Sequence, residues 1–240
     1  MRIISLVPSL TEALFDFGLN TSEVVGRTKF CIHPEDLVKQ IPIIGGTKNL
    51  NLEKIKALQP DLIIANKEEN DKNQIEELTK SFNVWITDIT NLEDNDQFLK
   101  RLGEILQKTD VAENYAATIE RSFSPVTRRL KTAYLIWQNP YMTIGNDTFI
   151  HDVMARKGLD NIFGHLTRYP EIHEDDLKNA ELILLSTEPF PFKESHVQEL
   201  QQKFPDKKVL LADGEAFSWY GTHLSRRKDY FKDFQRQIFR

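Results

Sequence analysis

The segment NLEKIKALQPDLIIA, Asn51 to Ala65, combines two signals that decide the fold. Asn51 is a favourable helix N-cap, and the apolar spacing after it predicts a short helix over Leu52 to Leu58. The run from Asp61 to Ala65 then predicts a buried strand. A helix that leads directly into a buried strand is typical of a parallel sheet covered by helices.

The same alternation recurs in both halves of the chain. DLKNAELILLS repeats the helix-to-strand pattern, and ELTKSFNVWITD is matched later by ELQQKFPDKKVLLAD. A capping box, Ser9-Leu-Thr-Glu12, predicts a further helix that Gly18 ends. The remaining predicted strands are 2–7, 24–26, 41–44, 83–88, TAYLIW, YMTIG, LILLS and KVLLAD, and the remaining predicted helices are 74–82, Phe149 to Arg156, Asp175 to Lys178 and His196 to Phe204.

Between the halves the strand signals stop. One helix is predicted from a cap at Thr90 to about Gln107, and a second opens at Asp110. We therefore expect an α/β protein with two Rossmann-like lobes, residues 1–108 and 131–240, joined by a long backbone helix over 109–130. Pro125 should kink or end that helix. Ligands of open α/β sheets bind at the carboxyl ends of the strands, so a cleft between the lobes is the expected site.

Composition narrows the class of ligand and partner. The chain has 240 residues, a formal charge of −5 and a pI near 5.7, which argues against nucleic acid as the main partner. With Cys31 alone, no intrachain disulfide forms. MRIISLVPSL indicates a first strand and not a leader, and no apolar run reaches membrane-helix length. Localisation is cytoplasmic if Met1 is the native start, and periplasmic or membrane-anchored if a leader was trimmed.

The motifs give little support for an enzyme. Gly45-Gly46-Thr47 matches neither a P-loop nor a dinucleotide fingerprint, and it is either a plain turn or part of a ligand-site rim. Ser9 lacks the nucleophile elbow of a hydrolase. Cys31 and His33 lack a second pair at zinc spacing, so we expect no metal site from the protein alone. No cofactor is expected either.

Three stretches resemble a known family. RIISLVPSLTEALFDFG, IIGGTKNLNLEKIKALQPDLIIA and GLDNIF resemble the helical-backbone periplasmic solute-binding proteins of iron-siderophore and vitamin B12 ABC transporters. The resemblance implies a monomeric binder, without catalytic residues, that holds an intact corrinoid or iron chelate in the cleft and delivers it to a permease. The alternatives are a cytoplasmic sensor or carrier on the same fold, and a metal- or nucleotide-dependent enzyme.

Candidate binding residues lie in loops that follow predicted strands, where aromatic side chains would form flat walls for a planar ligand. His33 or His223 could be an axial ligand to a chelated metal, and Arg168 and Lys67 could meet polar groups at the ligand's edge. We expect Trp219→Ala to weaken binding more than tenfold with little loss of stability. The candidates are Phe30, Cys31, His33, Asn66, Lys67, Glu68, Trp137, Tyr141, Arg168, Tyr169, Trp219 and Tyr220.

Two positions depart from the family. Asn66 stands where the resemblance leads us to expect an aromatic side chain, which makes one wall more polar. Lys72 stands at a position where the family carries an acidic residue that docks on the permease. Retention of permease docking is therefore left open by the sequence.

Overall fold

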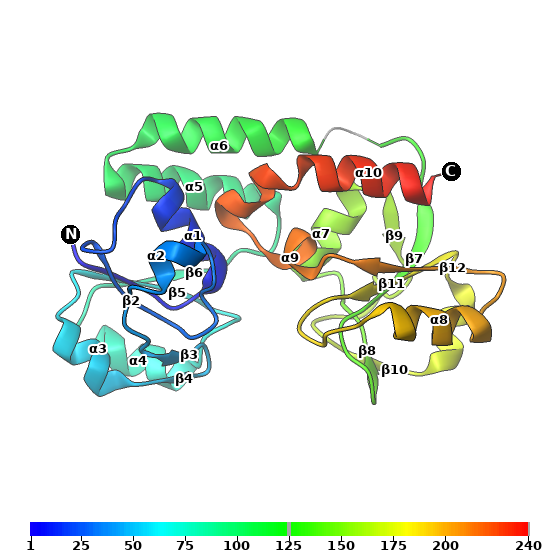
Figure 1. Cartoon of the computed structure of the whole chain (residues 1–240), viewed down its shortest axis with the longest axis horizontal. Coiled ribbons are helices and arrows are strands. Elements are labelled where there is room, and N and C mark those ends of the chain that lie inside the picture. Colours follow the sequence, from blue (N-terminus) through cyan, green and yellow to red (C-terminus); the bar gives the residue numbers. More distant parts are fainter. Residues whose placement is uncertain (124–125, 240) are drawn as a thin grey trace. The chain divides into compact units, whose positions relative to one another are not determined.

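The computed structural model describes residues 1–123 and 126–239 (Figure 1). The chain divides into two compact units. Unit 1 contains Met1–Ile89, Asp94–Ala117 and Tyr220–His223, and unit 2 contains Thr90–Glu93, Thr118–Trp219 and Leu224–Arg240. The chain therefore passes between the units several times, and one passage falls inside a continuous helix, α6 (Thr109–Ser122).

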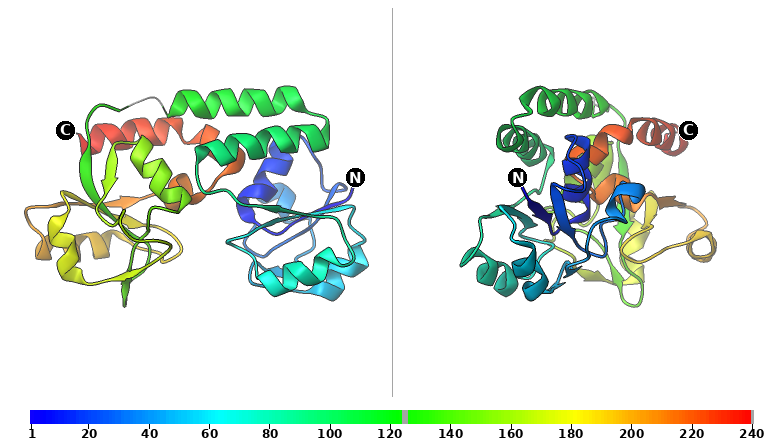
Figure 2. Two further views of the ribbon diagram at one scale, coloured as in Figure 1. Left: turned by 180° about the vertical axis from the view of Figure 1, so that it is seen from behind. Right: turned by 60° about the vertical axis from the view of Figure 1, so that its left-hand side comes forward.

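Unit 1 is built on a four-stranded parallel sheet with the order β2-β1-β5-β6. Helices α3 and α4 lie on one face of the sheet, and α1 lies on the other (Figures 1 and 2). The strands carry mainly Ile, Val and Leu, and their buried side chains join Ile55 and Leu78 of the helices in one core. The elements are β1 (Ile3–Ser5), α1 (Pro8–Asp16), β2 (Val24–Arg27), α2 (Glu35–Val38), β3 (Gly45–Gly46), β4 (Asn49–Leu50), α3 (Leu52–Leu58), β5 (Leu62–Asn66), α4 (Lys72–Thr79), β6 (Val84–Thr87) and α5 (Leu92–Leu106).

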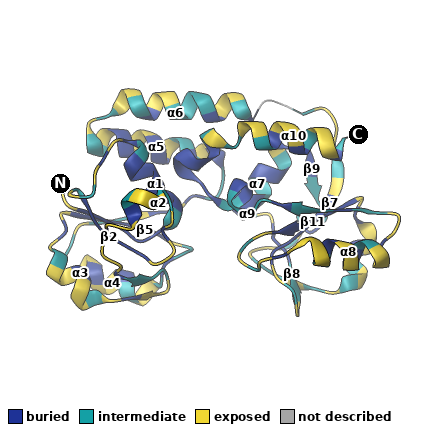
Figure 3. Ribbon diagram, in the orientation of Figure 1, coloured by how far each residue is buried: buried dark blue, intermediate teal, exposed yellow. Residues whose placement is uncertain are grey.

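Unit 2 repeats this arrangement with the order β12-β11-β7-β9, again parallel. Buried residues of β7 and β11 pack with Val197 and Leu200 of α8. Figure 3 shows β7 and β11 as largely buried and the outer side of α8 as exposed. A small antiparallel pair, β8 and β10, extends from this sheet. The elements are β7 (Leu130–Leu135), β8 (Tyr141–Met142), α7 (Phe149–Arg156), β9 (Leu159–Asn161), β10 (Glu171–Ile172), η1 (Glu174–Asn179), β11 (Leu182–Ser186), α8 (Glu194–Lys203), β12 (Lys208–Ala212), α9 (Gly214–Ser218), η2 (Gly221–Arg226) and α10 (Lys228–Ile238).

The two sheets have the same topology. In each, the first strand lies between the second and the third, and the fourth pairs with the third. The paired segments α3–β5 and η1–β11, and likewise α4–β6 and α8–β12, are the ones whose sequences resemble each other. This confirms the prediction of two α/β lobes with parallel sheets.

Several local predictions were wrong. Helix α1 begins at Pro8 with Val7 as N-cap and no side-chain cap, so Ser9 lies inside the helix and forms no capping box. Proline suits the first helical position because its missing N–H has no helical acceptor there. Residues 41–44 contribute only a bridge between Ile43 and Arg27, and YMTIG is a strand only over Tyr141–Met142.

The linking segment differs in length from its prediction. Helix α6 begins at Thr109 and ends at Ser122, and residues 126–129 are not helical. Pro125 lies outside the described residues. The division at 1–108, 109–130 and 131–240 stays a prediction. No helix in the described ranges combines the length and the apolarity needed to cross a bilayer.

Candidate functional site

The carboxyl end of β5 in unit 1 is a network of amides. Asn66 is buried, and its side-chain oxygen accepts hydrogen bonds from the backbone N–H groups of Glu68 and Glu69 at 2.9 and 3.2 Å. Its amide nitrogen donates to Thr87 Oγ1 at 3.2 Å. Asn66 therefore shapes the loop from within. Lys67, the next residue, is exposed and forms an ion pair with Asp88 at 2.7 Å.

The glycine pair forms a hairpin turn that braces this loop. Gly45 has φ +123°, and a Cβ there would lie 2.4 Å from the Asn49 carbonyl oxygen, so only glycine fits. Beyond it, the Thr47 carbonyl accepts from Asn70 at 3.0 Å, and Lys48 Nζ donates to the Glu68 carbonyl at 2.6 Å. These bonds give the segment GGTKN a structural role in holding the loop. Contact of its backbone with a ligand stays a prediction.

The loop after β2 points alternate residues inward and outward. Cys31 is fully buried, and its sulfur accepts a hydrogen bond from Thr11 Oγ1 at 3.0 Å. Burial raises the pKa of this thiol, so it stays protonated at neutral pH. Phe30 is 49% exposed and Ile32 is also exposed. Phe30 thus presents its ring at the surface as a wall residue would, while the Cys31 side chain does not.

Two histidines meet in unit 1. The rings of His33 and His223 stack with centroids 6.2 Å apart. His33 is half-buried, whereas His223 is buried with Nδ1 2.6 Å from Glu12 Oε2. A carboxylate bound to one ring nitrogen favours the tautomer whose other nitrogen accepts or ligates. Over the described ranges, no group of three or more His, Cys, Asp or Glu side chains is arranged to hold a metal.

Tyr220 belongs to unit 1 and is buried. Its hydroxyl donates to Glu69 Oε1 at 2.9 Å. Burial, followed by the charge of Glu69, raises the pKa of Tyr220 well above its ordinary value, so the phenol remains neutral. The predicted site residues of this unit therefore gather at one edge of its sheet, but only Phe30, His33, Lys67 and Glu68 have partial or full exposure.

In unit 2, a carboxylate fixes the segment around Trp219. Glu188 follows β11, and its Oε1 accepts from Ser218 Oγ at 2.7 Å and from Trp219 Nε1 at 3.1 Å. Burial is the main cause that raises the pKa of Glu188. Trp219 is only 8% exposed, so most of its ring contacts protein. The sequence does not identify Glu188, which lies in a run that resembles an ordinary turn.

An aromatic cluster surrounds the ends of β7 and β11. Trp137 is 40% exposed, and its ring meets Phe190 edge-on at 5.5 Å. Phe190 packs on Phe192 at 4.6 Å, and both contact His196. Tyr141 is half-buried and belongs to the same core. Phe190 and Phe192 are not among the residues predicted from the sequence, although the motif EPFPF directly after a strand is a signal for them.

Arg168 occupies an unusual backbone conformation at the rim of unit 2. Its φ is +59°, which is uncommon for a residue with a long side chain. The conformation is held by its N–H, which donates to Asp147 at 2.6 Å, and by its carbonyl, which accepts from Gly145 at 2.8 Å. The side chain is exposed, and the neighbouring Tyr169 is half-buried. Arg168 is therefore presented by a fixed backbone.

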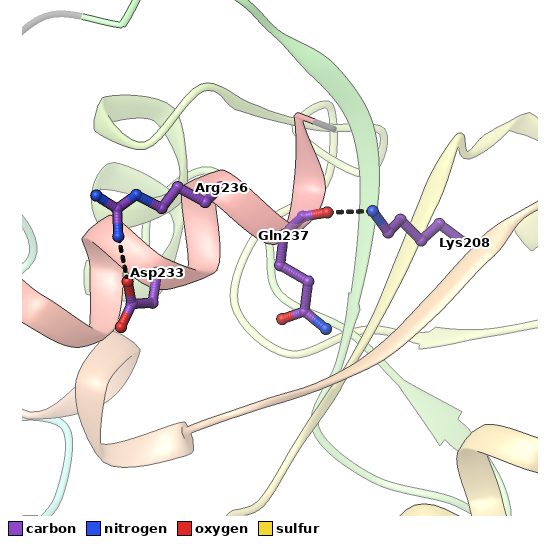
Figure 4. A pocket seen from close by; sticks show the side chains of 4 residues that line it. All are labelled: Lys208, Asp233, Arg236 and Gln237. Atoms are coloured by element: carbon purple, nitrogen blue, oxygen red, sulfur yellow. Dashed lines mark hydrogen bonds and ion pairs between the residues drawn. The ribbon is translucent and has the colours of Figure 1, made fainter.

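A surface pocket lies elsewhere in unit 2, between β12 and α10 (Figure 4). Its lining includes an ion pair between Arg236 and Asp233 at 3.0 Å, and Lys208 Nζ donates to the Gln237 carbonyl. None of the predicted site residues lines it. The charged groups already bind protein atoms, so the pocket gives no basis for a functional site.

Known proteins identify the family. The family described as periplasmic binding protein matches residues 3–208. The chain belongs to this periplasmic binding protein family. It is 27% identical over 169 residues to a vitamin B12-binding protein of Salmonella choleraesuis (strain SC-B67). The aligned residues cover 68% of this chain and 62% of the relative. The chain therefore matches less than two thirds of that relative's length.

Two solved structures share the fold of this periplasmic binding protein. The vitamin B12 binding protein BtuF of Vibrio cholerae matches with a TM-score of 0.79 and 19% identity, over 98% of this chain and 96% of that one. The heme-binding protein RhuT from Roseiflexus sp. RS-1 matches with a TM-score of 0.80 and 19% identity, over 98% and 97%. At these identities the likeness establishes the fold.

Proposed function

We propose that this periplasmic binding protein captures an intact corrinoid or other metal chelate, such as haem or a ferric siderophore, and delivers it to an ABC transporter. Membership of the family and relatives named for vitamin B12 and heme support a solute-binding role. The observation that carries the proposal is the exposed aromatic surface at strand ends, formed by Phe30 in unit 1 and by Trp137 over Phe190 in unit 2.

The chemistry of these edges suits a broad, flat ligand. An exposed aromatic ring gains free energy when a planar apolar face covers it, because both lose contact with water. Polar groups at the rim supply orientation: Lys67 and Arg168 are exposed cations that can meet carboxylate, phosphate or amide groups on the ligand. Half-buried His33 is the histidine better placed to approach a chelated metal, since His223 is buried against Glu12.

Titration tests the proposal directly. Aquocobalamin, cobinamide, haem and a ferric siderophore would each be titrated and followed by absorbance. Trp137→Ala removes about 100 Å² of apolar contact, which at about 25 cal/mol per Å² is about 2.5 kcal/mol, or more than tenfold in affinity. Phe239→Ala is the matched control, because Phe239 is a half-buried aromatic residue of the same unit that packs on Arg128, before the start of β7. Absence of binding to all four probes would refute the proposal.

The transporter partner and the compartment are part of the same proposal. We infer residence outside the cytoplasmic membrane, with an ABC permease as partner, and fractionation of cells that express the native gene tests this. Lys72, at the expected docking position, lies 3.7 Å from Glu76, while neighbouring Asp71 caps α4 and Glu69 binds Tyr220. Lys72→Glu should strengthen capture by a permease in proteoliposomes if this surface docks through an acidic group.

A further inference from the structure

Arg27 is a buried cation that binds three backbone carbonyls. It is the last residue of β2, at the carboxyl edge of the unit 1 sheet, and it is 8% exposed. Its Nε donates to the Val38 carbonyl at 2.6 Å, and its Nη1 donates to the carbonyls of Thr28 and Cys31, both at 3.1 Å. Across residues 1–123 and 126–239, no carboxylate forms an ion pair with this guanidinium.

The three carbonyls belong to one segment, Thr28–Val38, here called the ligand loop: its first residue, its fourth residue and its last. One side chain thus binds both ends of the loop and one residue between them. The side chain of that residue, Cys31, points into the core, where Thr11 binds its sulfur, so the flanking Phe30 and Ile32 are turned outward. The outward orientation of Phe30 and Ile32 therefore follows from the inward orientation of Cys31.

Arginine is suited to this arrangement in a way that lysine is not. The guanidinium is planar, always charged and carries donors in a fixed fork, so two of its nitrogens can bind separate carbonyls at once. A lysine offers its donors on a single nitrogen at the end of a flexible stem, so it does not hold them in the fixed fork that meets Val38 and Cys31 here. A buried charge without a carboxylate must be compensated by hydrogen bonds, and the carbonyls of the ligand loop supply them.

We propose that Arg27 is a positioning residue for ligand binding: its bonds to Thr28, Cys31 and Val38 hold the ligand loop so that Phe30 and His33 meet the chelate. The inference rests on the proposed function, in which Phe30 and His33 contact ligand. Arg27 itself does not touch ligand. It lowers the cost of binding because the loop is already ordered before the ligand arrives.

The first test needs no ligand. Arg27→Lys should speed amide hydrogen exchange at Cys31, whose N–H bonds to the Thr28 carbonyl, at least tenfold, while exchange in α7 of unit 2 stays unchanged. Arg101→Lys is the matched control, because Arg101 forms an exposed ion pair with Glu104 on α5. Unchanged exchange in the ligand loop would overturn the proposal. If Arg27→Lys does not fold, Arg27→Gln replaces it; failure of both would show a role in the whole fold and also overturn the proposal.

The second test is a double-mutant cycle with aquocobalamin and haem. Arg27→Lys should weaken binding about tenfold in the parent, but not further in a Phe30→Ala/His33→Ala background, because the loop has then lost the groups that Arg27 positions. An equal loss in both backgrounds would overturn the proposal, since a general structural effect would persist. If the parent binds neither of these but binds cobinamide or the siderophore, that probe takes their place. If it binds none of the four, the proposed function fails, whereas the exchange measurement still decides whether Arg27 holds the loop.

Discussion

Trp219 Nε1 donates a hydrogen bond to Glu188 Oε1 at 3.1 Å, which ties the indole to the loop after the third strand of the unit 2 sheet. The next residue, Tyr220, donates to Glu69 at 2.9 Å, in the loop after the third strand of the unit 1 sheet. The boundary between the units falls between these two aromatic residues. Each unit therefore fixes one of them through an equivalent carboxylate.

Trp219 is expected to support the fold. Because the side chain is 8% exposed, Trp219→Ala should lower the free energy of unfolding by about 3 kcal/mol or more. Trp219→Phe keeps most of the packing but loses the bond to Glu188, and should cost about 1 to 2 kcal/mol. Urea denaturation measures both. A stability of Trp219→Ala equal to that of the parent would instead favour the surface role expected from the sequence.

Glu188 should make stability depend on acid pH. Burial raises its pKa above the ordinary value of 4.5, so the folded state binds the proton more tightly than the unfolded chain does. The stability that Glu188 contributes is then fully present below pH 4.5 and is lost as pH rises through the raised pKa. Glu188→Gln removes this titration and keeps an acceptor for Ser218 and Trp219. Denaturation from pH 4 to 7 should show that the stability of the parent relative to the variant declines as pH rises; a difference that stays constant would contradict the prediction.

Lys157 should make the free energy of unfolding rise with pH at alkaline pH, the opposite sign to Glu188. It is buried, donates to the Ser122 carbonyl at 2.5 Å and lies over the Phe123 ring at 4.0 Å. Desolvation outweighs these contacts and lowers the pKa from 10.5 to about 8. The unfolded chain binds more protons between these values, so stability rises with pH across that window, by about 3 kcal/mol in full.

Lys157→Met isolates this effect, because the other lysines titrate equally in both proteins. The difference in unfolding free energy between parent and variant should change by on the order of 1 to 3 kcal/mol between pH 7.5 and 10. The lost bond to Ser122 adds a constant that does not depend on pH. A difference that is constant over this range would show that Lys157 titrates normally.

The glycine pair offers a matched comparison. Gly45→Ala meets the Asn49 carbonyl oxygen at 2.4 Å with φ +123°, and should cost about 2 kcal/mol or more. At Gly46 an added Cβ lies 3.4 Å from the Phe30 ring, which is ordinary contact, so Gly46→Ala should cost less than about 1 kcal/mol. Thermal melting of the two variants checks the order. Equal melting temperatures would mean that the hairpin backbone adapts freely.

The sequence predicted elements well where two signals coincided. Helices α3 and α7 were predicted with their observed bounds, because each has apolar periodicity behind a side-chain N-cap, Asn51 and Thr148. The capping box at Ser9 failed because Pro8 also favours the first helical position. Helix α10 was missed although Phe231, Phe234 and Ile238 recur at helical spacing and are buried.

The candidate site was harder to predict for a physical reason. A strand-end aromatic looks the same in the sequence whether it faces solvent, as Trp137 does, or is bound by a buried carboxylate, as Trp219 is. The partner that decides between these outcomes lies 31 residues away in Glu188. The role of Arg27 could not be predicted for the same reason, since its acceptors are backbone carbonyls, which every residue carries.

The buried thiol of Cys31 has a practical consequence for spectroscopy. Since this is the sole cysteine and its sulfur is closed off by Thr11 and Thr28, a maleimide dye finds no native target on the folded protein. A cysteine introduced at exposed Thr167, beside Arg168, would then carry the only fluorophore. If the proposed function holds, such a singly labelled protein would report binding of a chelate as a change in emission, and candidate ligands could be screened without separating bound from unbound.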